Sequence, residues 1–305
     1  VRLHLLHRAS GKECRIVSSL RRVESADRMI LDAPRAQTQP LPDAALLAAL
    51  RQRDFEPFFE PKLDTASGRV AGFEVLARLP GHQGRWIGPG QFVGALERLD
   101  RIHELTLILL DKALQSLATW QLRWPQLTLS LNAAAQSLSR EGFAAGLVAL
   151  ARAHGVPAQQ LIIEVTESAP LASLRDGLDS LVRLRTAGFS LAIDDFGTGH
   201  SSIEQLTKAP FTELKIDQMF TRHLVAQPEM RAVFESFMVV ARKFGLRVCA
   251  EGVEHPGTLR LAADLGAHEL QGWLIQPAMP AAEVPSCLLR FSDGQQYRAW
   301  YDAGG

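Results

Sequence analysis

Short runs rich in Leu, Ile and Val alternate along the chain with longer stretches of helical periodicity. The apolar runs predict strands at residues 127–132, 161–166, 190–194, 213–216, 247–250 and 269–273. Successive strands lie roughly 20 to 36 residues apart, an interval that fits one strand and one helix per repeat around a mostly parallel sheet. The pattern favours a (β/α) barrel over a doubly wound open sheet.

The residues before these units follow a different pattern. Asp43 can cap an Ala- and Leu-rich helix that ends near Arg53, and extended stretches follow at residues 55–63 and 69–79. The turn-forming residues 64–68 between the two stretches are too few for a parallel crossover, so we expect an antiparallel hairpin. With this hairpin, the sequence predicts an α/β barrel of about eight strands and an irregular opening.

Prolines divide the N-terminal region of the chain. Residues 33–43 hold three prolines and almost no large apolar side chain, which is typical of a linker. Residues 1–32 are too few to bury a core of their own, and we interpret them as a docking segment or as the remnant of an upstream domain. We expect the barrel domain at residues 44–290 and a C-terminal tail at 291–305. Because the chain does not begin with Met, we also expect it to be part of a longer protein.

Composition narrows the functional classes. The chain has 305 residues, of which 47% are hydrophobic and 22% charged, and its 33 basic residues balance 33 acidic ones. This balance gives no overall field that would attract a nucleic-acid polymer or an anionic membrane. The three cysteines lie far apart, and the chain shows neither a signal peptide nor an apolar run of membrane-spanning length. We therefore expect a cytoplasmic protein that does not insert into membranes.

Polar side chains lie at the ends of the predicted strands, where each apolar run stops. They are Glu74, Asn132, Glu164, Asp194 with Asp195, Lys215, Glu251 and Gln271. In barrels the C-terminal ends of the strands converge on one site, so these residues should meet. One acid at a strand end is usually a helix cap or a solvated charge, but a series at successive strands is not explained that way. Several carboxylates in one cavity need compensation, and their hard oxygen ligands suit Mg²⁺ or Mn²⁺.

Two chemistries fit this set of residues. The first is metal-assisted hydrolysis of a phosphodiester, in which a shared carboxylate bridges two ions. The second is enolase-like proton abstraction, with Lys215 as the base and a metal ion holding an enolate. The adjacent pair Asp194 and Asp195 can serve two ions, which favours hydrolysis without excluding the alternative.

Ordered motifs give the chain a resemblance to a known family. The motifs are Glu74-Val75-Leu76-Ala77-Arg78, Leu131-Asn132, Glu164-Val165-Thr166-Glu167, Asp194-Asp195-Phe196-Gly197-Thr198-Gly199, Leu214-Lys215-Ile216-Asp217, Glu251-Gly252-Val253-Glu254 and Gln271-Gly272-Trp273 with Pro277. In this order they resemble the EAL-domain family of bacterial cyclic-di-GMP phosphodiesterases over about residues 45–290. The resemblance implies a modified (β/α)8 TIM-type barrel with an antiparallel first strand, and hydrolysis of cyclic di-GMP to linear pGpG.

The resemblance also implies roles for individual residues. Glu74, Asn132, Glu164 and Asp194 would hold one metal ion, and Asp194, Asp195 and Glu251 a second. Lys215 would contact the attacking water, Glu251 is a candidate general base, and Asp195 completes the catalytic set. The substrate side would include Arg78 at a phosphate with Glu60, Leu76, Glu254 and Gln271, while Glu167 would brace the Asp-Asp-Phe-Gly loop. Family membership further implies a homodimer and an upstream sensor or regulatory partner.

Some positions depart from the family pattern. Glu60 lies where an amide is usual, and an ionised carboxylate there would repel substrate phosphates unless it is protonated or paired. Trp273 replaces a Tyr and keeps an aromatic face for a base. Because the metal-ligand positions are intact, we favour an enzyme. The alternatives are a catalytically silent cyclic-di-GMP receptor and a regulator that acts through protein contacts alone.

Overall fold

The strands of the computed structural model form one sheet that closes on itself. The structure describes residues 41–81, 84–166, 177–199 and 202–305. The ring consists of β1 (Glu56–Asp64), β2 (Val70–Pro80), β4 (Thr128–Asn132), β5 (Leu161–Thr166), β6 (Ser190–Phe196), β7 (Glu213–Ile216), β8 (Arg247–Ala250) and β9 (Glu269–Gln271). Neighbours run in the order β1-β9-β8-β7-β6-β5-β4-β2, and the β1–β2 pairing closes the ring. The predicted barrel is therefore confirmed.

The first strand is the irregular one. β1 pairs antiparallel with β2 and with β9, whereas the other neighbours in the ring are parallel. The predicted hairpin is thus confirmed, and its register places Glu60 opposite Glu74. Two short strands, β3 (Trp86–Ile87) and β10 (Met279–Pro280), extend β2 and β1 outside the ring.

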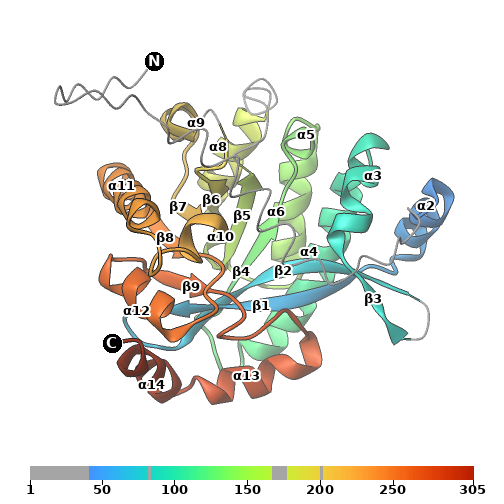
Figure 1. Ribbon diagram of the computed structural model, residues 1–305. Coiled ribbons are helices and arrows are strands. Elements are labelled where there is room, and N and C mark those ends of the chain that lie inside the picture. Colours follow the sequence, from blue (N-terminus) through green and yellow to red (C-terminus); the bar gives the residue numbers. More distant parts are fainter. Residues whose placement is uncertain (1–40, 82–83, 167–176, 200–201) are drawn as a thin grey trace. The chain divides into compact units, whose positions relative to one another are not determined.

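Helices surround the strands (Figure 1). They are α2 (Asp43–Gln52), α3 (Val93–Arg98), α4 (Ile102–Trp120), α5 (Ala135–Leu138), α6 (Phe143–Ala153), α8 (Leu178–Ala187), α9 (Ser202–Lys208), α10 (Gln218–Thr221), α11 (Pro228–Phe244), α12 (Pro256–Asp264), α13 (Val284–Arg290) and α14 (Gln295–Ala303). Short 3₁₀ turns lie at Pro89–Gln91, Ala158–Gln160 and Ala281–Glu283. In α11 the buried residues Met230, Phe234, Met238 and Ala241 recur at helical spacing, so one face packs on the barrel.

Two boundaries differ from the prediction. Asp43 is the first residue of α2 and not its cap, because Pro42 holds the N-cap position with no side-chain hydrogen bond. The Asp43 carboxylate instead pairs with Arg98 at 2.8 Å. β9 ends at Gln271, two residues early, because Gly272 adopts φ +150° and leaves the extended conformation.

The two segments predicted to flank the barrel domain differ in what the structure describes of them. The predicted segment 1–32 and residues 33–40 of the predicted linker lie outside the described residues. Residues 291–305, set apart in the sequence as a tail, include α14, which packs against α12. Phe291 is fully buried, and the Tyr301 hydroxyl donates to Asp264 of α12.

The apolar core lies between the strands and the helices. Phe59 and Phe73 of the hairpin pack edge-on against each other, with ring centroids 6.3 Å apart, and Phe59 contacts Trp120 of α4 at 4.9 Å. The opposite face of these strands points into the barrel and is polar, since Lys62 and Glu74 are buried there together with Lys215 of β7. Barrel interiors usually hold Val, Ile and Leu, so this polar interior indicates function.

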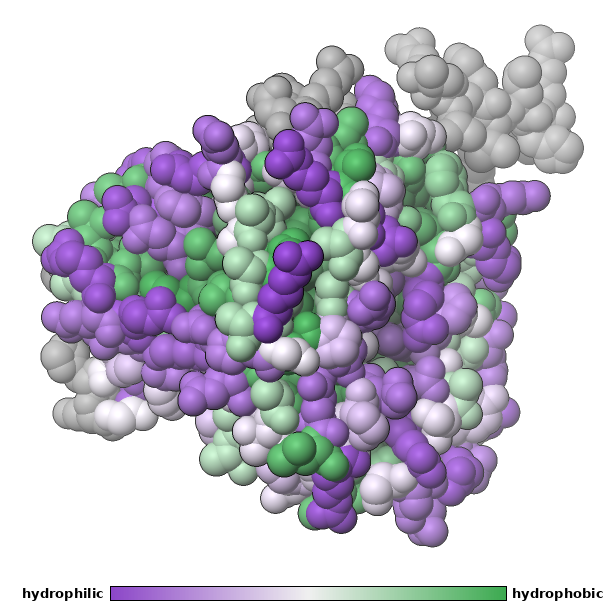
Figure 2. All heavy atoms as spheres, turned by 180° about the vertical axis from the view of Figure 1, so that it is seen from behind, coloured by the Kyte–Doolittle hydropathy of each residue, from purple (hydrophilic) through white to green (hydrophobic). Residues whose placement is uncertain are grey.

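The outer surface is largely hydrophilic on the face opposite to that of Figure 1. Figure 2 shows polar side chains over most of this view, with apolar side chains gathered in smaller areas between them. Scattered exposed apolar residues are normal on a protein surface. None of the helices in the described ranges is long and apolar enough to cross a membrane.

Candidate active site

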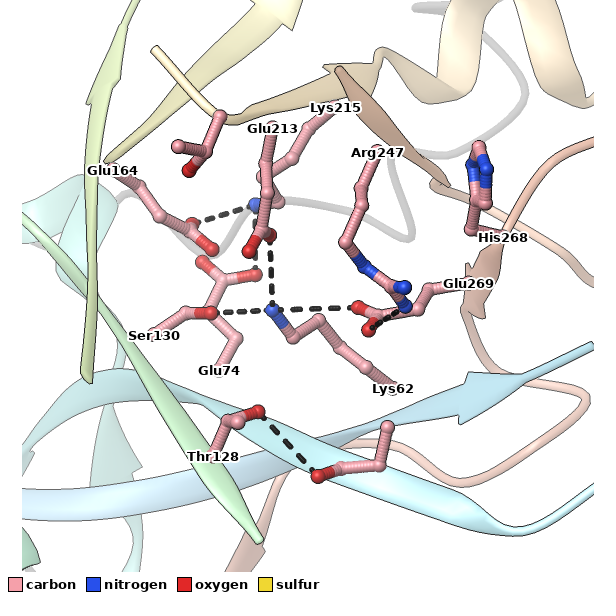
Figure 3. Close-up of polar contacts among 12 residues, drawn as sticks. Lys62, Glu74, Thr128, Ser130, Glu164, Glu213, Lys215, Arg247, His268 and Glu269 are labelled. Atoms are coloured by element: carbon pink, nitrogen blue, oxygen red, sulfur yellow. Dashed lines mark hydrogen bonds and ion pairs between the residues drawn. The ribbon is translucent and has the colours of Figure 1, made fainter. Parts of the chain in front are cut away.

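One buried lysine lies at the centre of the polar interior. Lys215 on β7 is 1% exposed, and its Nζ atom lies 3.1 Å from Glu74, 2.7 Å from Glu164, 3.0 Å from Asp194 and 2.6 Å from Glu251. Figure 3 shows Glu74 and Glu164 converging on this ammonium from β2 and β5. The acids predicted at separate strand ends therefore meet at one point.

A cavity of about 370 Å³ opens above this cluster. It is lined by Glu60, Glu74, Leu76, Asp194, Asp195, Lys215, Gln218, Arg222, Glu251, Gly252, Glu254, Gln271, Gly272 and Trp273. Most of these residues belong to the ends of parallel strands and to the segments that follow them, as expected for the functional face of a barrel. Glu60 and Glu74 are exceptions, because they lie within the hairpin strands; the predicted strand-end position of Glu74 is therefore wrong.

Two groups of carboxylates could each hold a metal ion. Glu74, Glu164 and Asp194 form one group and Asp194, Asp195 and Glu251 the other, with ligand atoms within 4.8 Å of one another in each group. Asn132, the remaining predicted ligand, donates from Nδ2 to Glu74 Oε1 at 2.8 Å, so its Oδ1 atom remains available. Asp194 belongs to both groups, as the sequence predicts for a bridging ligand.

The donor set fits a divalent cation. Glu164 Oε1 is buried without a hydrogen-bond partner, and a single ammonium serves four carboxylates. Burial, together with Glu74 and Asp194, raises the pKa of Glu164 to about 8, and burial also raises the pKa of Glu251 well above its usual range. These carboxylates are hard ligands, and the single ammonium does not fully compensate their negative charge. Mg²⁺ or Mn²⁺ would supply the missing positive charge.

A local backbone distortion brings the two adjacent aspartates into the same cavity. Consecutive strand residues normally point to opposite faces. The β6–β7 register shifts between Ile193 and Phe196, and Asp195 adopts φ +55°, so both Asp194 and Asp195 line the cavity. The left-handed conformation costs a non-glycine residue about 1 kcal/mol or more. Burial, with Asp194 beside it, raises the pKa of Asp195 to about 6.

The residues predicted on the substrate side are not all at the cavity wall. Glu60, Leu76, Glu254 and Gln271 line it. Arg78 does not; its guanidinium lies 5.4 Å from the centre of the Phe58 ring and donates to the carbonyl of its neighbour Ala77. Glu167, which was predicted to brace the loop, lies outside the described residues.

Glu60 occupies an electrostatically unfavourable position. Burial and the nearby Glu74 raise its pKa to about 7, against the lowering effects of Lys215, a hydrogen bond from Gln271, and Arg78. Gln271 also donates to Glu74 Oε2 at 2.8 Å. Near neutral pH, Glu60 therefore carries only part of a negative charge.

Two residues that line the cavity were not predicted from the sequence. Gln218 and Arg222 come from α10 and the residue that ends it, and Arg222 pairs with Glu254 at 2.6 Å. The only local signal is Asp217, whose side chain caps α10 by accepting from the backbone N–H of Met219 at 2.8 Å. That cap predicts a helix start but not the direction of an arginine five residues later.

Comparison with known proteins identifies the family. The family model described as "EAL domain" matches residues 43–278, which is most of the chain. The chain belongs to the EAL domain family. This match confirms the predicted family, and the closed ring of strands in this EAL domain confirms the predicted fold.

Relatives of this EAL domain include cyclic di-GMP phosphodiesterases. One is PA2567 of Pseudomonas aeruginosa, 34% identical over 230 residues that cover 75% of this chain and 39% of the relative. Another is RocR of the same organism, 30% identical over 251 residues that cover 82% of this chain and 64% of the relative. Among solved structures, the complex of the PaMucR phosphodiesterase with c-di-GMP matches with a TM-score of 0.74 and 30% identity, covering 79% of this chain and 98% of that one.

The relatives are longer than the part matched by this EAL domain. The chain spans about two fifths of PA2567 and somewhat under two thirds of RocR. The phosphodiesterase activity given in their names is that of PA2567 and RocR.

Proposed function

We propose that the chain hydrolyses one phosphodiester bond of cyclic di-GMP to give linear pGpG, with Mg²⁺ or Mn²⁺ as cofactor. The observation that carries the proposal is the pair of carboxylate groups that share Asp194 beside a buried lysine. Relatives named as cyclic di-GMP phosphodiesterases at 30% identity or more support the choice of substrate. Enolase-like chemistry would need Lys215 as a base. Burial alone would lower the pKa of Lys215, but the four surrounding carboxylates outweigh that effect, raise the pKa well above its usual range and keep the amine protonated.

The side chains around Lys215 would have different roles in the reaction. Two ions held by Glu74, Asn132, Glu164, Asp194, Asp195 and Glu251 would supply an acidified water and positive charge for the phosphate. Lys215 is a fixed ammonium that can donate to the attacking water and hold its oxygen toward the phosphorus atom. Glu251, whose carboxylate lies 2.6 Å from Lys215 Nζ, is the candidate to accept the proton that the water loses. Attack breaks one P–O bond, and the released ribose oxygen takes up a proton.

The opposite wall of the cavity would bind the nucleotide. Trp273 is 62% exposed and offers a stacking face for a base. Glu254, held by Arg222, presents a carboxylate that can accept from N–H groups of a purine. Arg78 would reach a phosphate only by leaving the Phe58 ring, so we propose that it moves when the substrate binds. Glu167 remains a proposed brace of the loop.

The decisive test is chromatography of the nucleotides after incubation of cyclic di-GMP with the chain and Mg²⁺ or Mn²⁺. We expect pGpG from the wild type and none from Glu74→Ala, which removes a ligand. Glu229→Ala is the matched control, since Glu229 is an exposed acid on α11. Tight binding without pGpG would identify a silent receptor. Neither binding nor pGpG would leave a regulator that acts through protein contacts.

Other family features extend the proposal beyond the site. We expect a homodimer, which sedimentation would detect, and an upstream sensor or regulatory partner. A cytoplasmic location follows from the substrate, because a second messenger acts inside the cell. Residues 44–290 would be the catalytic domain in this arrangement.

A further inference from the structure

A second cavity opens at the other end of the barrel. Its volume is about 620 Å³, larger than that of the candidate active site and within the usual range for small-molecule sites. Its lining includes the starts of five parallel strands, at Thr128, Ser190, Glu213, Arg247 and Glu269. The proposed phosphodiesterase uses the ends of the strands, so this cavity shares no lining residue with it.

The floor of this cavity holds two buried carboxylates that are incompletely hydrogen-bonded. The side chains of Glu213 and Glu269 are each 9% exposed. Lys62 lies 4.0 Å from Glu213 Oε2 and 3.6 Å from Glu269 Oε2, both beyond hydrogen-bond length, because its ammonium donates to Ser130 (Figure 3). Arg247 donates to Glu269 Oε1 at 3.0 Å, which leaves Oε2 without a donor.

Glu213 is the less satisfied of the two acids. Among the described residues the Glu213 side chain accepts no hydrogen bond, and its one ion pair is the long contact with Lys62. Burial raises the pKa of Glu213, as expected for a carboxylate that is desolvated without sufficient partners. Leaving a buried carboxylate without a hydrogen-bond partner is unfavourable, so a ligand that donates N–H groups here gains that interaction.

The outer part of the cavity has the opposite character. Arg69 and Arg123 line it and are exposed. Arg123 stacks on the ring of Trp124 at 5.0 Å, and neither arginine forms an ion pair within the described ranges. Leu127 and Ile162 add buried apolar side chains to the lining. The cavity therefore combines buried acceptors, apolar side chains and exposed cationic donors.

We infer that this cavity binds a small zwitterion whose ammonium or guanidinium group reaches Glu213 and Glu269 and whose carboxylate or phosphate meets Arg69 and Arg123. An ammonium carries three N–H donors and satisfies the open carboxylate oxygens. A ligand with only a cationic end would leave the arginines unpaired. A purely anionic ligand would place charge against Glu213.

The test is calorimetric binding to the whole chain without metal ion or cyclic di-GMP, so its outcome is independent of the phosphodiesterase proposal. The probes are 6-aminohexanoate, L-arginine and phosphoethanolamine, with hexylamine and hexanoate as analogues that carry one charged end. We expect at least one zwitterion to bind with a dissociation constant of about 1 mM or lower. Each single-charge analogue should bind at least about tenfold more weakly than 6-aminohexanoate or not at all.

Variants locate the binding. Glu213→Gln removes the charge at the floor and Arg123→Met removes one at the rim, and each should weaken binding about tenfold or more. Arg123 is exposed, so its variant should melt like the wild type and remain informative even if Glu213→Gln does not fold. Arg183→Met on α8 and Glu229→Gln on α11 are matched controls outside the cavity. The inference is overturned if no zwitterion binds at about 10 mM, if hexylamine binds as well as 6-aminohexanoate, or if folded variants bind like the wild type.

Discussion

Replacing Glu164 by glutamine should make the stability of the chain depend less on pH when metal is absent. The same replacement should reduce the stabilisation that a divalent metal ion gives. The pKa of Glu164 rises from 4.5 to about 8 on folding. The folded state therefore holds a proton that the unfolded state releases, and stability is full below pH 4.5 and falls as pH rises to about 8. A neutral amide at this position carries no charge at any of these pH values, so the variant avoids this loss.

The magnitude follows from the shift. Each pKa unit corresponds to about 1.4 kcal/mol, so the shift from 4.5 to about 8 sets an upper limit of roughly 5 kcal/mol. Lys215 and the neighbouring acids readjust their own protonation, which reduces the measured difference to about 1–3 kcal/mol. Divalent metal at a hundred times its dissociation constant should stabilise the wild type by about 2.7 kcal/mol and the variant by much less.

Urea unfolding at pH 5 and pH 9 measures both effects, first with a chelator and then with Mn²⁺. We expect Glu164→Gln to lose less stability than the wild type between the two pH values when metal is absent. Mn²⁺ should narrow or reverse that difference at pH 9. Glu229→Gln, an exposed acid, should follow the wild type throughout. Equal pH dependence of the wild type and Glu164→Gln, or equal stabilisation by Mn²⁺, would refute the reasoning.

The other predictions concern three further positions. Lys62→Met should destabilise the chain by about 3–5 kcal/mol in urea unfolding, because it leaves buried Glu213 without its ion-pair partner and Glu269 with Arg247 alone; a loss below about 1 kcal/mol would contradict this. Glu60→Gln should give an equal or lower Michaelis constant for cyclic di-GMP, with the largest gain above pH 7 where Glu60 is ionised; a clear rise would show that the carboxylate helps binding. Gly272→Ala should cost about 2 kcal/mol or more in thermal unfolding, since φ is +150° and the new Cβ would lie 2.3 Å from the backbone nitrogen of Val253; a stability equal to the wild type would contradict this.

Much of the barrel could be predicted because the parallel strands are short segments rich in Leu, Ile and Val that recur between helical stretches. β5 (Leu161–Thr166) and β7 (Glu213–Ile216) have the bounds that the sequence predicts. Convergence of Glu74, Glu164 and Asp194 also follows from the sequence, since parallel strands of a barrel end at one face. The hairpin was predictable from loop length alone.

Features that depend on side-chain direction or local backbone distortion could not be predicted. The turn of Asp195 into the cavity depends on its φ of +55° and on a register shift, and neither leaves a pattern in the residues. The pairing of Arg222 with Glu254 joins two loops that are distant in sequence. Lys62, at the centre of the second charged cluster, comes from the antiparallel strand β1. The alternation of residues along a strand shows which side chains are buried, but not which partners they contact.

The central claim is that the carboxylates around Lys215 hold divalent ions. Anomalous diffraction from crystals soaked in Mn²⁺ tests it directly, because the metal is located by its own scattering. We predict one peak among Glu74, Glu164 and Asp194, and a second among Asp194, Asp195 and Glu251. Crystals with well-ordered carboxylates and no peak among them, or Mn²⁺ bound only elsewhere on the chain, would contradict the account.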